Sequence, residues 1–160
     1  MSSEREARMK GRELALAVLC HLESYPPAEH ARAIALVLDS PPVGDAEGED
    51  AIAALAGDPG ARSFATELTD AWSARREAID ELIDTTSNSW RLARMDRVDR
   101  NVLRIATAEL LGVESTPRAA ILAEAVRLAS RYGSDRSAPF VNGLVEALAR
   151  RARPQAPEVG

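Results

Sequence analysis

Apolar residues recur at helical spacing along most of the chain. From residue 5 to residue 25 they come every three or four positions, which predicts a helix with one buried face. The apolar positions of this first helix are Leu14, Val18, Leu22 and Tyr25. Pro26 and Pro27 end it, and a second helix is expected over about 28–38.

The same spacing predicts the helices of the second half. Residues 62–84 are expected to be helical, with a break or bend near 73–76. Asp96 is the expected N-cap of a helix that ends at Gly112. Thr116-Pro117 is a helix start signal, Gly133 ends that helix, and a last helix follows a short loop. No run alternates with the period of a strand, so the predicted fold class is all-α, with six or seven helices.

The segment 40–60 interrupts this pattern. It is rich in Pro, Gly and acidic residues, and residues 39–58 contain six acidic residues and no basic one. We expect an exposed acidic connection here, with one or two helical turns at 50–55. The chain is therefore expected to form a single all-α domain over 1–153 that includes this connection, followed by a disordered tail at 154–160.

The composition argues against an enzyme. The chain has one cysteine and two histidines, which excludes an internal disulfide and leaves too few ligands for a typical zinc site. Cys20 and His21 are neighbours on one helix, so their side chains diverge by about 100° and cannot form a nucleophile–base pair. Phosphate-binding glycine loops and the Gly-x-Ser-x-Gly motif are missing from the sequence. We therefore expect no catalytic residues, no metal and no cofactor.

Hydropathy and the N-terminus bear on location. No segment approaches the roughly 18 uninterrupted apolar residues of a membrane span. The first residues lack the apolar core of a signal peptide. We expect a cytoplasmic protein that has no membrane partner.

Basic residues gather near the start of the first helix although the net charge is −5. The negative charge is concentrated in 39–58, so local patches matter more than the total. The basic residues are Arg5, Arg8, Lys10 and Arg12. A solvated helix end is the plain interpretation. Positive charge at a helix N-terminus opposes the helix dipole, which favours an anionic partner such as RNA.

A second candidate is the loop after the predicted helix at 117–133. Its candidate RNA-binding residues are Arg131, Tyr132, Ser134 and Arg136. An aromatic ring beside arginines suits stacking on a splayed base together with phosphate contact. The alternative is that Tyr132 completes the apolar face formed by Ile121, Ala125 and Leu128.

A longer arginine series precedes and enters the predicted helix at 96–112. Its members are Arg91, Arg94, Arg97, Arg100 and Arg104. They would line one helical face. A solvated or partner-facing surface is favoured over direct contact with RNA.

Two motifs resemble the transcription antitermination protein NusB family. The first is Asp99-Arg100-Asn101-Val102-Leu103-Arg104-Ile105-Ala106 followed by Glu109-Leu110, with Trp90 and Arg94 upstream. The second is Glu124-Ala125-Val126 with Leu128-Ala129, Tyr132-Gly133, Ser137 and Phe140-Val141-Asn142-Gly143. Arg12-Glu13-Leu14-Ala15-Leu16, preceded by Arg8 and Lys10, is similar to the family's arginine-rich first helix. The resemblance covers about residues 5–151 except the acidic connection.

This resemblance implies both a fold and a function. The family's fold is two packed helical bundles. Its members bind boxA-type elements of nascent ribosomal RNA together with the ribosomal protein NusE, and the pair joins the RNA polymerase antitermination complex. By this resemblance the basic residues of the first helix and the loop around Tyr132 would form one RNA surface, and NusE would bind mainly near the 99–110 helix. Some members form homodimers.

The chain also departs from the family pattern. Cys20 stands where many members have an aromatic residue, and Ala108 and Ala123 replace an aromatic and an asparagine. Arg136 stands where some members have an acidic residue. The first change weakens base stacking and the last strengthens phosphate attraction. One alternative is therefore a protein-interaction module with the same fold that has lost sequence-specific RNA binding. Another is an accessory domain like the one that opens some ribosomal RNA methyltransferases.

Overall fold

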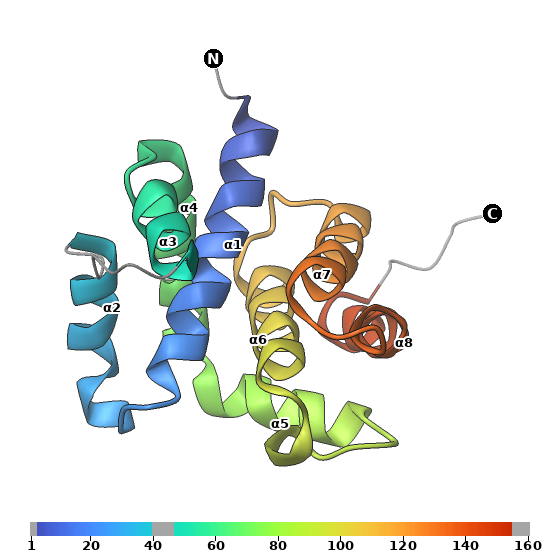
Figure 1. Cartoon of the computed structure of the whole chain (residues 1–160). Coiled ribbons are helices and arrows are strands. Elements are labelled where there is room, and N and C mark those ends of the chain that lie inside the picture. Colours follow the sequence, from blue (N-terminus) through green and yellow to red (C-terminus); the bar gives the residue numbers. More distant parts are fainter. Residues whose placement is uncertain (1–2, 40–46, 155–160) are drawn as a thin grey trace. The chain divides into compact units, whose positions relative to one another are not determined.

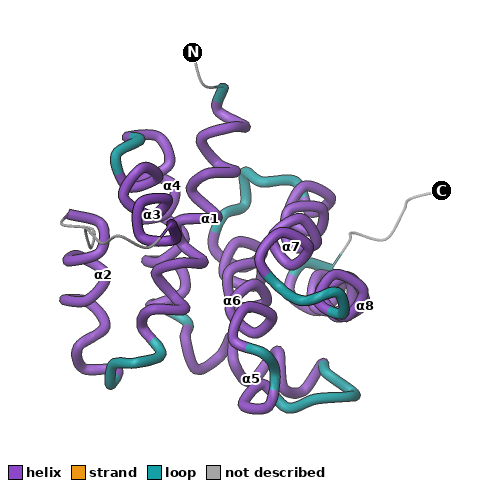
Figure 2. Tube along the Cα trace, in the orientation of Figure 1, coloured by secondary structure: helices purple, strands orange, loops and turns teal. Residues whose placement is uncertain are grey.

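The computed structural model describes residues 3–39 and 47–154, and in them it contains eight α-helices and no strand (Figure 1, Figure 2). The all-α class is confirmed, and the helices outnumber the six or seven predicted. One reason is that residues 62–84 divide into α4 (Pro59–Ala74) and α5 (Arg76–Thr86). The other is that α3 (Glu47–Ala56) forms where one or two turns were expected. Residues 40–46 of the acidic connection and 155–160 of the tail lie outside the described residues.

Contacts divide the chain into two compact units, Met1–Asp70 and Ala71–Gly160. The boundary falls inside α4, so one helix belongs to both units. The expected single domain over 1–153 stays a prediction. No helix in the described part of the chain has both the length and the apolar character that crossing a membrane requires.

The first unit is built on α1 (Glu4–Leu22), which is followed by a 3₁₀ turn (Pro27–Glu29) and α2 (His30–Asp39). Leu14, Val18 and Leu22 are buried as the spacing predicts, and the Ser3 hydroxyl caps the helix by accepting a hydrogen bond from the Glu6 amide. The prediction that Tyr25 belongs to the buried face is wrong. It lies beyond the end of α1, where the helical face no longer continues, and it is 38% exposed.

Gly11 sets how closely α1 and α4 approach each other. A Cβ at this position would lie 2.8 Å from Phe64 Cβ and 3.0 Å from the carbonyl oxygen of Ala61. A larger side chain would therefore push α4 away. Asp58 starts α4 by accepting hydrogen bonds from the amides of Gly60 and Ala61, with Pro59 at the first helical position.

The second unit places α6 (Arg97–Gly112) at the centre of its core. Residues 101–103 and 105–110 are all buried, so this helix is covered on nearly every side. It packs against α7 (Arg118–Tyr132) and α8 (Ser137–Ala152), which also pack against each other, and α5 contacts α6 and α8. α6 ends at Gly112 as predicted. Asp96 holds the N-cap position, although its side chain makes no capping hydrogen bond.

Two arginines connect helices within this unit. Arg104 of α6 forms a two-pronged ion pair with Asp80 of α5, with N–O distances of 2.9 and 3.1 Å, and also donates to Asn101. Arg153, just after α8, donates five hydrogen bonds to four carbonyl oxygens around the end of α6. Both arginines therefore stabilise the packing of α6 against its neighbours.

Candidate nucleic-acid interface

The N-terminal cluster consists of Arg5, Arg8, Lys10 and Arg12 on the first turns of α1. Arg5 is exposed and Arg8 is half-buried. Arg8 lies 3.5 Å from Glu4 across one helical turn, and its guanidinium carbon is 4.9 Å from the centre of the Phe64 ring. An ion pair of this kind between side chains one helical turn apart contributes at most about 1 kcal/mol.

Lys10 is held by two carboxylates. Its ammonium lies 3.7 Å from Glu6 and 3.4 Å from Asp58. Hydrogen bonds from the amides of Ala61 and Gly60, together with Lys10, lower the pKa of the Asp58 carboxyl below its ordinary value, against a smaller effect of burial. Asp58 therefore stays ionised and competes with any phosphate for Lys10.

Arg12 is buried, with 4% of its surface exposed. Its guanidinium carbon lies 5.2 Å from the centre of the Phe64 ring, the same ring that Arg8 contacts. A buried cation over an aromatic ring stabilises the packing of α1 on α4. The spacing in the sequence grouped Arg12 with Arg5 and Arg8, but only the position of Phe64 shows that Arg12 faces inward.

The loop cluster consists of Arg131, Tyr132, Ser134 and Arg136, between α7 and α8. Tyr132 is 43% exposed, so it does not complete the buried face of Ile121, Ala125 and Leu128. The Arg131 guanidinium carbon lies 5.4 Å from the centre of the Tyr132 ring. Arg131, Ser134 and Arg136 are exposed. The loop cluster therefore combines an exposed aromatic ring that has a cation beside it with two further exposed polar or cationic side chains.

Ser137 holds this loop in place. Its hydroxyl accepts a hydrogen bond from the Ser134 amide at 2.9 Å and donates one to the Asp99 carboxylate. A Cβ on Gly133 would lie 2.3 Å from Ser137 Oγ, so glycine is required there by close approach. The φ of Gly133 is −93°, which any residue can adopt. The sequence predicted that α7 ends at Gly133, but the need for glycine at this position comes from its close contact with Ser137.

A cavity of about 290 Å³ lies beside the loop cluster, and the sequence did not reveal it. Its lining residues are Trp90, Arg94, Met95, Asp96, Asp99, Arg136 and Phe140. Asp99 is 6% exposed, and its Oδ1 is buried without a hydrogen-bond partner. Burial raises the pKa of the Asp99 carboxyl, the nearby Asp96 charge raises it further, and the hydrogen bond from Ser137 lowers it. Asp99 thus lines the cavity while its Oδ1 is buried from solvent and has no hydrogen-bond partner.

The two clusters belong to different units. Each is assembled within its own unit, and their union into one RNA surface stays a prediction. The described residues contain no group of three or more His, Cys, Asp or Glu side chains that could hold a metal ion.

Comparison with known proteins identifies the family. The model of the NusB family matches residues 9–150. The chain belongs to the NusB family. The transcription antitermination protein NusB of Geobacter sulfurreducens is 36% identical over 143 residues, which cover 89% of this chain and 94% of that relative. NusB of Sorangium cellulosum is 50% identical over 93 residues, which span 66% of its length, slightly less than two thirds.

Solved structures agree with this membership. NusB of T. maritima has a TM-score of 0.66 and 29% identity, and the match covers 89% of this chain and 90% of that one. A chain in the structure titled "Crystal Structure of a Plectonemic RNA Supercoil" has a TM-score of 0.69, and the match covers 94% of this chain and 99% of that one. Because the two sequences are only 22% identical, this match shows likeness of fold alone. NusB proteins are transcription antitermination factors, which confirms that the chain is not an enzyme.

Three arginines of the series from Arg91 to Arg104 make contacts within the fold. Arg91 donates to the Asp84 carbonyl at 3.0 Å, Arg100 donates to the Met95 carbonyl, and Arg104 pairs with Asp80. Arg91 and Arg94 precede α6, so the series does not line one face of one helix as predicted. Much of what identifies the NusB family in this chain thus maintains its structure.

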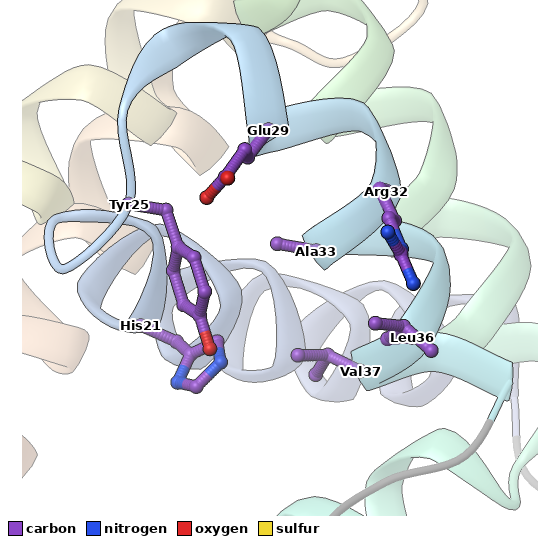
Figure 3. Close-up of a pocket in the computed structure, with 7 residues that line it drawn as sticks. All are labelled: His21, Tyr25, Glu29, Arg32, Ala33, Leu36 and Val37. Atoms are coloured by element: carbon purple, nitrogen blue, oxygen red, sulfur yellow. The ribbon is translucent and has the colours of Figure 1, made fainter.

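The first unit has a separate groove of about 520 Å³ between the end of α1 and α2 (Figure 3). The rings of His21 and Tyr25 lie side by side on one side, with centroids 5.1 Å apart, and Leu36 lies on the other. Arg32 and Glu29 stand at its edge. Both rings are exposed, and His21 directly follows Cys20 in the sequence.

Proposed function

We propose that the chain is an RNA-binding transcription antitermination factor that acts with the ribosomal protein NusE on boxA-type elements of nascent ribosomal RNA. It would do so within the RNA polymerase antitermination complex in the cytoplasm. Membership of the NusB family over residues 9–150 supports this function. The observation that supports RNA contact is the exposure of Tyr132, whose ring is 43% exposed with the cationic Arg131 beside it, since aromatic rings and arginines are the groups on which single-stranded bases stack.

The charge distribution predicts that RNA binding is weak without the protein partner. Arg12 is buried and Lys10 is shared by two carboxylates. Phosphate contacts therefore fall mainly on Arg5, Arg8, Arg131 and Arg136. Four contacts with single-stranded RNA give a slope of log K against log salt concentration near −3.

A titration of labelled boxA-type RNA tests this function. Fluorescence anisotropy is measured over a range of salt concentrations, with and without NusE. We expect binding that strengthens when NusE is present and a slope near −3. Absence of binding under both conditions would refute the proposal. Light scattering over a concentration series, with and without RNA, tests whether a homodimer competes with RNA.

Matched variants identify the contacts. Arg5→Gln combined with Arg131→Gln removes two phosphate contacts and is expected to flatten the slope by about 1.4. Arg150→Gln is the control because its side chain is 67% exposed on α8 and forms a surface ion pair with Glu146. Arg12→Ala is unsuitable as a binding variant, since its loss would disturb the packing on Phe64.

A protein-interaction module that has lost sequence-specific RNA binding is the second candidate. The neutralisation of Lys10 by Glu6 and Asp58 favours it, as does the net charge of −5. In that case NusE would bind equally well to the wild type and to the Arg5→Gln, Arg131→Gln variant. Neither protein would then protect boxA-type RNA.

A further inference from the structure

The buried acid Asp99 takes no part in the contacts proposed above. Only 6% of the residue is exposed, and its Oδ1 is buried without a hydrogen-bond partner. Burial raises the pKa of this carboxyl, the hydrogen bond from Ser137 lowers it, and the charge of Asp96 one helical turn earlier raises it. An ionised carboxylate with one unsatisfied oxygen is costly in such a place, so its protonation responds readily to a change in nearby charge.

A chain of hydrogen bonds leads from Asp99 into the loop cluster. The buried Ser137 hydroxyl donates its proton to the Asp99 carboxylate. Because a hydroxyl has a single proton, Ser137 Oγ accepts from the loop: the Ser134 amide lies at 2.9 Å and the Ser134 hydroxyl at 3.4 Å. The Arg136 amide donates in turn to Ser134 Oγ at 3.4 Å. All donors along this chain therefore point toward the carboxylate.

Charged groups from three segments surround the same cavity as Asp99. They are the acid Asp96 and the cation Arg100 on α6, Arg94 on the 3₁₀ turn before it, and Arg136 in the loop. Arg100 reaches the cavity by donating to the carbonyl of Met95, one of its lining residues. The cations offset the charge of an ionised Asp99. A phosphate that binds to Arg136 removes part of this offset.

We propose that RNA binding at the loop cluster is coupled to protonation of Asp99, so that the chain takes up a proton there when RNA binds. This inference rests on the proposed function and adds a regulatory property to it. Asp99 does not touch the RNA, since it is buried, and acts through its charge and through Ser137. When Asp99 is neutral, the loop donors are no longer drawn toward a charge, and Arg136 attracts phosphate without competition.

The direction of the pH dependence follows from linkage. A bound phosphate adds negative charge near Asp99, so the pKa of its carboxyl, already raised in the free chain, is higher still in the complex. RNA affinity is then constant below the pKa of the free chain, falls between the two pKa values and is constant again above the higher one. One charge acting over several ångströms of partly wet protein changes affinity about three- to tenfold.

The test measures affinity for boxA-type RNA, with NusE present, from about pH 4.5 to pH 8. Wild-type affinity is expected to fall about three- to tenfold over this range, and Asp99→Asn is expected to lack that fall and to bind more tightly than wild type at pH 8. Calorimetry in two buffers with different heats of ionisation counts the protons taken up, up to one for wild type. Comparison with Asp99→Asn cancels the titration of RNA and NusE.

Two further variants move the pH-dependent interval in opposite directions. Ser137→Ala removes the hydrogen bond that lowers the pKa of Asp99, so the fall in affinity is expected at higher pH. Asp96→Asn removes a charge that raises this pKa, so the fall is expected at lower pH. The Asp96 side chain makes no capping hydrogen bond, so the start of α6 is kept. A purely structural role of these residues would not produce opposite shifts.

Arg150→Gln on α8 is the control for a surface change, and thermal melts at each pH show that the variants fold. If Asp99→Asn does not fold, the opposite shifts of Ser137→Ala and Asp96→Asn decide. The coupling is overturned if Asp99→Asn keeps the pH dependence and proton uptake of wild type, or if the other two variants shift the interval in the same direction. The proposed function would survive those results. If the wild type binds no RNA at any pH, with or without NusE, both proposals fail.

Discussion

Replacing Arg153 by alanine should destabilise the second unit far more than replacing its neighbour Arg150. The Arg153 guanidinium donates to the carbonyls of Glu109, Leu110 and Val113 at the end of α6 and to that of Thr116 before α7, at 2.6–3.3 Å. The carbonyls of Glu109 and Val113 also accept hydrogen bonds from the amides of Val113 and Thr116, so Arg153 adds to the backbone bonding at this helix end. The cation also lies at the negative end of the α6 dipole.

The magnitude follows from these contacts. A hydrogen bond from a charged donor contributes about 1.5–3 kcal/mol, but these five share one side chain and the freed carbonyls are only partly buried, so water replaces some of them. We take roughly 0.7 kcal/mol for each of the four carbonyls, about 3 kcal/mol in total. Arg153→Lys keeps the charge but loses the planar fork, so about half of that loss is expected. Arg150 makes one exposed pair with Glu146, worth about 0.3–0.5 kcal/mol.

Urea denaturation monitored by tryptophan fluorescence is the assay. Both tryptophans, Trp72 and Trp90, belong to the second unit, so the signal reports on that unit. We expect a lower midpoint with an unchanged m value for Arg153→Ala, and a fall in melting temperature of roughly 10–20 °C. If Arg153→Ala and Arg150→Ala differ by less than about 0.5 kcal/mol, the carbonyl contacts do not stabilise the fold and the reasoning is refuted.

Two further predictions concern single positions. Gly11→Ala should lower the free energy of unfolding by about 1–2 kcal/mol, because the new Cβ would lie 2.8 Å from Phe64 Cβ. Gly143→Ala, which has open space around it, should raise the free energy of unfolding by about 0.5–1 kcal/mol. Thermal melts followed by circular dichroism measure both changes, and equal effects of the two substitutions would contradict the packing argument. Asp99→Asn should gain stability relative to wild type as the pH rises from about 4 to 7. The raised pKa of Asp99 means that ionising it disfavours the folded state, so its contribution is full below the unfolded pKa and declines above it. A stability difference between Asp99→Asn and wild type that does not change with pH would show that Asp99 ionises without cost.

The sequence determined the helical class, most helix boundaries and the family. Helical spacing of apolar residues depends only on local geometry, so Leu14, Val18 and Leu22 could be placed in the core directly. The end of α6 at Gly112 follows from local signals in the same way. The family motifs could be read because they are contiguous along the chain, although they also include residues such as Arg104 that hold the fold together.

Tertiary structure decided which polar side chains are available for binding. Arg12 and Arg8 share one helical face in sequence terms and both contact the Phe64 ring of α4, but Arg12 is buried whereas Arg8 is half-buried. Tyr132 continues an apolar spacing, yet it is exposed because α7 ends there. Asp99 looks like an ordinary acid in a first helical turn, and only the folded structure shows that it is buried with an oxygen that has no hydrogen-bond partner. Burial and hydrogen-bond satisfaction depend on residues distant in sequence, so one-dimensional spacing could not specify them.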